Sequence, residues 1–414
     1  MLLNHIFASL LAVGASSALP RESFTKRAVD FNWEEDIVRG LNLGGWLVLE
    51  PWITPSIFQK LDGVKDEYSL TEKLGKEKSY DILRPHWETW ITEPDFHQIK
   101  DWGFNLVRIP IGYWAYQRYK GDPYVDGAAD YLDKALGWAR NAGLKVMVDL
   151  HSAPGSQNGY DNSGEKKDFL GFQHDESTDV TLNVLQEMSD RYADQQDVVV
   201  AIELLNEPFG PDLDMDKLKQ FYRDGYGKVR GKSDTPVVIH DAFEEASYWN
   251  GFLTPEDDNA QNVILDHHEY QVFEDEKIQW PNWKHRQEVC NMQSKYQGSD
   301  KFVVIGEWSA AQTDCAPALN GYGIGSRYEG LYPNSTGVGP CGSINWIDEW
   351  DQQLKDDTRG YIEAQLQVYE RSTRGWIFWT FKTEASAEWD VTRLINYGVF
   401  PQPLDDRKFD IICS

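Results

Sequence analysis

The sequence is poor in cysteine and in positive charge, and it lacks the motifs of several other protein classes. Its four Cys form no Cys-x-x-Cys or Cys-x-x-His pair, so their spacing is unlike that of a zinc site. The 40 Lys and Arg against 67 Asp and Glu give a net charge of −27, which disfavours nucleic acid and anionic membranes and favours a neutral ligand. No Gly-x-Gly-x-x-Gly follows a strand-like run, which weakens a dinucleotide-binding interpretation.

Long apolar runs are also absent after the N-terminus, so no membrane helix and no C-terminal lipid anchor is expected. Residues 1–18 contain a short apolar core and a small-residue cleavage site, which predicts a secretory signal peptide. Residues 19–27 end in Lys26-Arg27 and are predicted to be a propeptide, which leaves residues 28–414 as the mature domain. A secreted chain with an even number of Cys is expected to form two disulfides, with three pairings open, and Asn334 begins a glycosylation sequon.

Strand-like runs that are apolar on both faces recur along the mature chain, with helical patterns between them. This alternation predicts a single-domain α/β fold, the (β/α)8 TIM barrel, with a doubly wound open sheet as the competitor. One helix is expected over residues 129–142, with Gly143 at its C-cap. The strand-like runs are residues 38–43, 105–110, 144–150, 199–205, 236–240, 263–267, 302–305 and 376–379.

A polar residue follows several of these runs. In barrel enzymes, the catalytic residues lie at the carboxyl ends of the strands. Two of these polar residues are carboxylates, Glu207 in Asn206-Glu207-Pro208 and Glu307 in Gly306-Glu307-Trp308. One protonated and one ionised carboxylate across a bond are what glycoside cleavage requires. The 17 Trp also suit stacking on sugar rings. The polar or aromatic residues at the other strand ends are Arg108, His151, His267, His268 and Trp379.

Each of these residues also has a structural interpretation. Arg108 fits a buried ion pair, His151 a core histidine and Trp379 a core aromatic. The pair His267-His268 is more often structural than metal-binding. The combination of residues therefore carries the hypothesis, and no single residue does.

The combination of motifs resembles glycoside hydrolase family 5, and within it the fungal secreted exo-β-1,3-glucanases. The likeness spans nearly the whole mature chain. The motifs are Leu41-Asn42-Leu43-Gly44-Gly45-Trp46, Glu50-Pro51-Trp52, Val107-Arg108-Ile109-Pro110-Ile111-Gly112, the run from Asp149 to Gly159, Asn206-Glu207-Pro208, the run from His267 to Phe273, Gly306-Glu307-Trp308-Ser309 and the run from Trp379 to Glu384.

The resemblance implies a role for each matching residue. Glu207 matches the proton donor and base, and Glu307 matches the nucleophile. The expected substrate-binding residues are Glu50, Arg108, His151, Tyr160, Asp161, Asn206, His268, Tyr270, Phe273 and Trp379. Among them, Arg108 and Tyr270 are expected to lower the pKa of Glu307. Tyr160 and Phe273 match an aromatic clamp at the entrance, with Tyr160 where a Phe is usual. Glu269 stands where His is common.

The resemblance also implies the disulfides Cys290–Cys413 and Cys315–Cys341, the second closing a long loop over one side of the site. The expected activity is release of glucose from the non-reducing ends of β-1,3-glucan by a secreted, monomeric, retaining enzyme without metal or cofactor. Transglycosylation is compatible with the same chemistry. The alternatives are an endo-β-1,4-glucanase or mannanase of the same family, and a catalytically silent glucan-binding wall protein.

Overall fold

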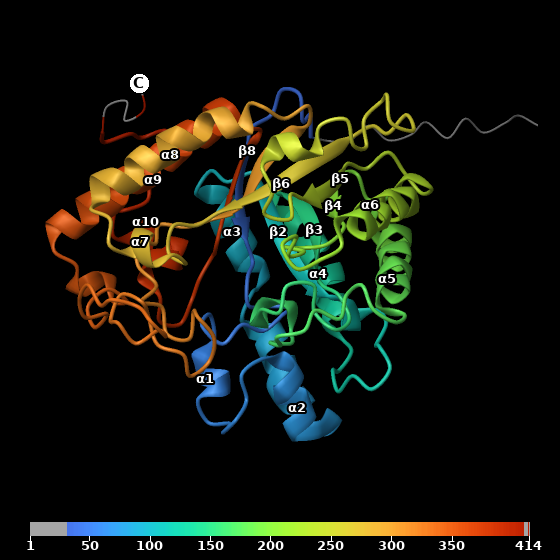
Figure 1. The fold of residues 1–414 in the computed structure, drawn as a ribbon, viewed down its shortest axis with the longest axis horizontal. Coiled ribbons are helices and arrows are strands. Elements are labelled where there is room, and N and C mark those ends of the chain that lie inside the picture. The colour runs from blue at the N-terminus through green and yellow to red at the C-terminus, as the bar shows by residue number, and fades with distance from the viewer. Residues whose placement is uncertain (1–30, 410–412, 414) are drawn as a thin grey trace, which may run out of the picture.

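The protein is organised around a closed barrel of eight parallel strands that follow one another in chain order (Figure 1). The computed structural model describes residues 31–409 and Cys413. The barrel confirms the predicted (β/α)8 fold. The predicted signal peptide and propeptide lie outside the described residues.

The strands are β1 (Val38–Asn42), β2 (Leu106–Gly112), β3 (Lys145–Ser152), β4 (Val199–Glu203), β5 (Val237–His240), β6 (Val263–Glu269), β7 (Phe302–Trp308) and β8 (Gly375–Phe378). The helices are α1 (Pro55–Phe58), α2 (Glu67–Thr89), α3 (Glu93–Asp101), α4 (Ala128–Ala142), α5 (Ser177–Tyr192), α6 (Met215–Arg230), α7 (Asp275–Ile278), α8 (Asn282–Tyr296), α9 (Gln352–Ser372) and α10 (Val391–Asn396). The short 3₁₀ helices are η1 (Tyr113–Ala115), η2 (Asp161–Ser163), η3 (Ala246–Trp249), η4 (Ile347–Glu349) and η5 (Ala387–Trp389).

Hydrophobic patterning explains the two layers. The strands are buried on both faces because side chains fill the barrel interior and helices cover its outside. Helix α4 buries the face that carries Leu132, Leu136 and Ala139. It ends at Gly143, whose left-handed φ of 74° confirms the predicted C-cap.

Aromatic side chains close the amino end of the barrel. Phe31 and Trp33 are buried against the strand residues Met147 and Val200. The Trp33 Nε1–H group donates to the Val200 carbonyl oxygen at 3.2 Å. The predicted site residues lie at the opposite, carboxyl end of the barrel.

A long segment, residues 309–351, connects β7 to α9 and forms the orange loops beside α1 in Figure 1. The disulfide Cys315–Cys341 lies within it, and Cys290 on α8 is joined to Cys413. These are the pairings that the family resemblance implied. Among the residues that the structure describes, no helix combines the length and apolar character needed to cross a bilayer.

Candidate active site

Four of the twelve predicted catalytic and substrate-binding residues lie on the strands themselves, and the others lie in the segments that follow the strands. Strands β3, β6 and β7 run further than the sequence predicted, and they include His151, His268 and Glu307. Arg108 lies within β2 and is fully buried. Glu207 follows β4 and has a left-handed φ of 43°, a conformation that is uncommon for non-glycine residues.

A register shift between β6 and β7 positions the Glu307 side chain. His267 pairs with Ile305 and His268 pairs with Glu307, so Gly306 is the extra residue on β7. The Gly306 N–H donates to Asp266 Oδ1 at 2.7 Å. A Cβ atom on Gly306 would lie 2.1 Å from Asp266 Oδ2, so this position has no room for a side chain.

The Glu307 carboxylate accepts two hydrogen bonds. Arg108 Nη1 donates to Oε1 at 2.8 Å, and the Tyr270 hydroxyl donates to Oε2 at 2.9 Å. The same guanidinium donates to Asn206 Oδ1 at 2.8 Å and to Glu203 Oε2 at 2.8 Å. Arg108 thus fixes Glu307 and Asn206 relative to each other.

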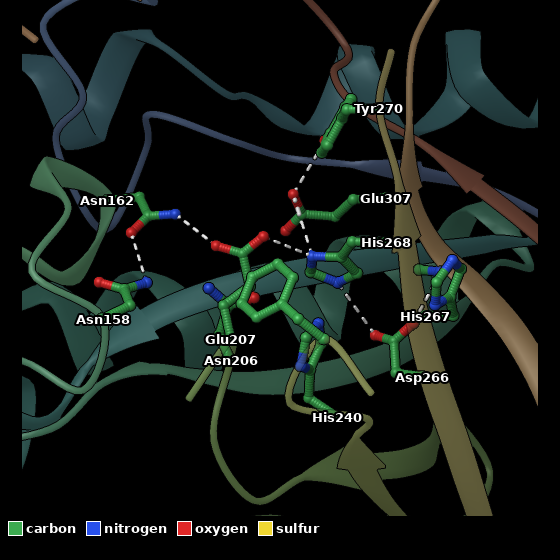
Figure 2. Close-up of polar contacts among 12 residues, drawn as sticks. Asn158, Asn162, Asn206, Glu207, His240, Asp266, His267, His268, Tyr270 and Glu307 are labelled. Atoms are coloured by element: carbon green, nitrogen blue, oxygen red, sulfur yellow. Dashed lines mark hydrogen bonds and ion pairs between the residues drawn. The ribbon is translucent and has the colours of Figure 1, made fainter. Parts of the chain in front are cut away.

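The Glu207 carboxylate is held from two sides (Figure 2). His268 Nδ1 donates to Oε1 at 2.8 Å, and Asn162 Nδ2 donates to Oε2 at 2.8 Å. Asn162 was missed at the sequence level, although it follows the predicted Asp161 directly. The Asn158 side chain holds it in turn, by donating to Asn162 Oδ1 at 3.0 Å.

One imidazole nitrogen faces both carboxylates. His268 Nδ1 lies 2.8 Å from Glu207 Oε1 and 3.5 Å from Glu307 Oε2 (Figure 2). These two oxygens are therefore separated by no more than the sum of the two distances, about 6.3 Å. Retaining glycosidases hold their carboxyl groups about 5–5.5 Å apart and inverting ones about 6.5–9.5 Å apart, and the bound on the two facing oxygens is compatible with the retaining spacing.

The shared imidazole makes the two carboxylates unequal. Burial raises the pKa of Glu307 to about 7, against the opposing positive charges of His268 and Arg108. Burial also raises the pKa of Glu207, but the hydrogen bond and charge of His268 outweigh it and bring the pKa to about 2. Arg108 lowers the pKa of Glu307, as expected, but the desolvation of this carboxylate is the larger effect, so the pKa lies above its usual value.

A second layer of charged groups lies beneath the pair. Arg108 contacts Asp149 at 3.1 Å and Asp266 at 4.0 Å, besides Glu203. Asp266 Oδ2 also faces His268 Nε2 at 3.4 Å. Burial lowers the pKa of His268, but Glu307 and Asp266 outweigh it and hold the pKa well above its usual range.

Two groups in this cluster approach the spacing of metal ligands, and both include His268. They are Glu207 with His240 and His268, and Glu203 with Asp266 and His268. A metal ligand needs a neutral imidazole with a free nitrogen. Both nitrogens of His268 face carboxylates, so these groups fit a proton-holding network better than a cation site.

The predicted glycone residues, which are expected to bind the non-reducing-end sugar, include two aromatic or imidazole rings and two buried carboxyl groups. The Trp379 and His151 rings are stacked at 5.7 Å with an interplanar angle of 8°. Glu50 is buried and accepts a hydrogen bond from Trp52 Nε1 at 2.9 Å. Burial, together with the charge of Asp161, raises the pKa of Glu50 well above its usual value. Asp161 is also buried, and its Oδ2 atom has no hydrogen-bond partner within the described structure.

Aromatic side chains surround the mouth of the site. Tyr160 and Phe273, the predicted clamp, are 43% and 44% exposed. The Tyr160 ring lies 6.1 Å from Phe209, and the Phe209 ring lies 5.6 Å from Phe243, which is also 43% exposed. Phe209 follows the Asn-Glu-Pro motif directly, so its position in the sequence was a usable signal.

Adjacent histidines on β6 serve different faces of the strand. His267 Nδ1 donates to Asp241 Oδ2 at 2.5 Å and Nε2 donates to Glu269 at 3.3 Å. Burial lowers the pKa of His267, but these carboxylates raise it to about 10. Glu269 and Asp241 therefore both form ion pairs with His267. His240, which ends β5, was missed at the sequence level although its ring lies 4.5 Å from that of His268.

A barrel that presents two buried carboxylates at the carboxyl ends of its strands is typical of glycoside hydrolases. The family model described as cellulase (glycosyl hydrolase family 5) matches residues 73–322. The chain belongs to glycosyl hydrolase family 5.

Similar proteins cover the chain almost completely. The glucan 1,3-beta-glucosidase of Candida oleophila is 45% identical and covers 98% of this chain and 98% of its own length. The glucan 1,3-beta-glucosidase of Blumeria graminis is 47% identical over 97% of this chain and 96% of its own length. The crystal structure of rutinosidase from Aspergillus niger has a TM-score of 0.70 at 19% identity, with 90% of this chain and 99% of that chain covered, and so shares the fold.

Proposed function

We propose that this protein is a retaining glycoside hydrolase that releases glucose from the non-reducing ends of β-1,3-glucans. The observation that carries the proposal is the pair of carboxylates held by one imidazole, with at most about 6.3 Å between the facing oxygens. The full-length similarity to proteins named glucan 1,3-beta-glucosidase supports the substrate class.

In the first step, the Glu307 carboxylate attacks the anomeric carbon and forms a glycosyl-enzyme ester. The bond to the leaving oxygen breaks as Glu207 protonates that oxygen. Glu207 needs a proton for this, and His268 Nδ1–H lies 2.8 Å from its Oε1 atom. In the free enzyme this proton stays on His268, because the pKa of Glu207 is about 2. Formation of the ester removes the charge of Glu307 that raises the pKa of His268, and so favours transfer of the proton to Glu207, the acid that the step requires.

In the second step, Glu207 is a carboxylate again and accepts a proton from an incoming water. The water oxygen bonds to the anomeric carbon and the ester to Glu307 breaks, which restores the nucleophile. A sugar hydroxyl in place of water gives transglycosylation by the same steps. Arg108 and Tyr270 stabilise the carboxylate that is released.

The sugar-binding roles that we propose are those that the family resemblance implies. Asn206, fixed by Arg108, binds the 2-hydroxyl of the sugar. Trp379 forms the floor on which the ring stacks. Glu50 and Asp161 bind hydroxyls of the non-reducing-end sugar, and Tyr160 and Phe273 hold the next sugar at the mouth.

The enzyme is proposed to be secreted and monomeric, with residues 1–18 as signal peptide and residues 19–27 as propeptide. Two disulfides within the described residues and the fungal relatives support an extracellular location. Asn334 is exposed, as a glycosylated residue must be, and its glycosylation remains a prediction.

Product analysis on a pure linear β-1,3-glucan tests the proposal. Glucose should be the main early product, and NMR of the first turnovers should show it as the β-anomer. Glu307→Gln should remove turnover and leave the folded state intact, because an amide cannot form the ester. Early release of mixed oligomers, or faster cleavage of carboxymethylcellulose, would instead favour the endo-β-1,4 alternative. Glucan binding without any bond cleavage would favour a catalytically silent protein.

A further inference from the structure

The loop after β3 and the segment after β7 start on opposite sides of the barrel, four strands apart in either direction. They nevertheless meet: the Lys166 ammonium group donates to the Asn320 carbonyl oxygen at 2.9 Å. Lys166 belongs to the β3–α5 loop that carries Asp161 and Asn162, and Asn320 belongs to the segment 309–351. This hydrogen bond links two segments that start on opposite sides of the barrel mouth.

Both sides of this link are rigidly held. The backbone N–H of Lys166 donates to the buried Asp66 Oδ2 at 2.7 Å, and its carbonyl accepts from Lys65 Nζ at 3.0 Å. These partners lie at the start of α2, where Asp66 is the N-cap. Asp66 therefore fixes the backbone of Lys166, from which the side chain extends to Asn320.

The acceptor side is fixed by a buried carboxylate next to a disulfide. Asp314 Oδ2 accepts from Asn320 Nδ2 at 2.9 Å and from the Arg327 backbone N–H at 2.7 Å, beside Cys315 of the disulfide. Arg327 Nε also lies 3.4 Å from Asp275 of α7, just after Phe273. The segment is thus tied to the loops on both sides of the site.

Only glycine fits at position 321, next to the ammonium group of Lys166. Gly321 has a φ of +109°, and a Cβ atom there would lie 1.9 Å from Lys166 Nζ. The same ammonium lies near the glycone residue Asp161: burial raises the pKa of Asp161 to about 6, and the charge of Lys166 opposes that rise. The link therefore stands at the glycone end of the site.

We propose that Lys166 is a specificity-determining residue: by tying the β3–α5 loop to the Asn320–Gly321 turn, it closes the glycone end so that only the non-reducing end of a glucan enters. The inference rests on the proposed function and assigns its exo mode to one contact. An open groove at this point would let a chain pass through and be cut internally.

The test compares wild type, Lys166→Met and the matched control Lys167→Met, because Lys167 pairs with Glu165 of its own loop at 2.8 Å. The substrates are laminaripentaose and the same pentaose capped by a 3-O-methyl group on its non-reducing glucose. Wild type and Lys167→Met should release glucose and spare the capped compound. Lys166→Met should raise the ratio of capped to free cleavage at least about tenfold and yield laminaribiose among its first products.

An unchanged ratio in folded Lys166→Met would overturn the inference while leaving the proposed function standing. Wild type that releases no glucose would overturn the proposed function itself. Gly321→Ala is the second variant, because its methyl group displaces the ammonium and leaves the charge in place. It should reproduce the change in ratio, and it decides the question if Lys166→Met does not fold.

Discussion

The positive charge of His268 should control the acidic limb of the pH–rate profile, and His268→Gln removes it. Glu307 must be ionised to attack, so activity falls as the pH drops below the pKa of this group. His268 Nδ1 lies 3.5 Å from Glu307 Oε2, and an opposite charge within about 4–6 Å lowers a carboxyl pKa by about 1–3 units. Glutamine keeps an N–H donor for Glu207 and loses the charge, so the pKa of Glu307 should rise above about 7.

The assay is kcat/KM against pH for an aryl β-glucoside, since this ratio reports the pKa values of the free enzyme. The acidic limb of His268→Gln should move to higher pH by about 1–3 units, and well below the limb each unit costs about tenfold in rate. His267→Gln is the matched control, because it removes a neighbouring charged histidine that contacts Asp241 and Glu269 instead. A folded, active His268→Gln variant with an unmoved acidic limb would refute this account of the pair.

Two further predictions concern the register shift and the buried histidines. Gly306→Ala should lower kcat by about 100-fold, because its methyl group collides with Asp266 and misplaces the adjacent nucleophile. The same collision should lower the free energy of unfolding by about 1–3 kcal/mol. Wild-type kcat with an unchanged melting temperature would contradict this. Burial lowers the pKa of His86 to about 4, so folded protein binds fewer protons than unfolded protein and loses stability as the pH falls from 6.5 to about 4. His86→Gln should reduce that loss by up to roughly 3 kcal/mol in urea unfolding at pH 7 and pH 4, and an equal loss in both proteins would contradict it.

The sequence allowed the barrel and most of the site to be predicted, because strand-end residues of parallel strands converge wherever the barrel closes. Glu207, Glu307, Arg108 and Asn206 were found in this way. In the structure Arg108 is hydrogen-bonded to Glu307 and Asn206, and His268 lies between Glu207 and Glu307. Their chemical roles remain predictions. The physical basis for finding them was the alternation of apolar runs with polar ends, which depends on local sequence alone.

The other features of the site depend on strand register and on how deeply each side chain is buried, and local sequence patterns do not encode either. The extra residue Gly306 reverses which side chains of β7 face the interior, and only the pairing with β6 reveals it. The local sequence pattern does not distinguish His267 from His268, of which only the family resemblance selected His268, yet they contact different carboxylates. The pKa order of the two carboxylates was also unpredictable, because it follows from complete desolvation and one shared imidazole.

The tie between Lys166 and Asn320 has a kinetic consequence for long polymers. A pocket with one opening has a single path for both arrival and departure. The glucose released from the chain end lies behind the shortened polymer, so the polymer must leave before the glucose can. Each cut then requires a new encounter, which makes degradation distributive rather than processive. The rate on an insoluble glucan would accordingly follow the number of accessible chain ends and not the mass of polymer.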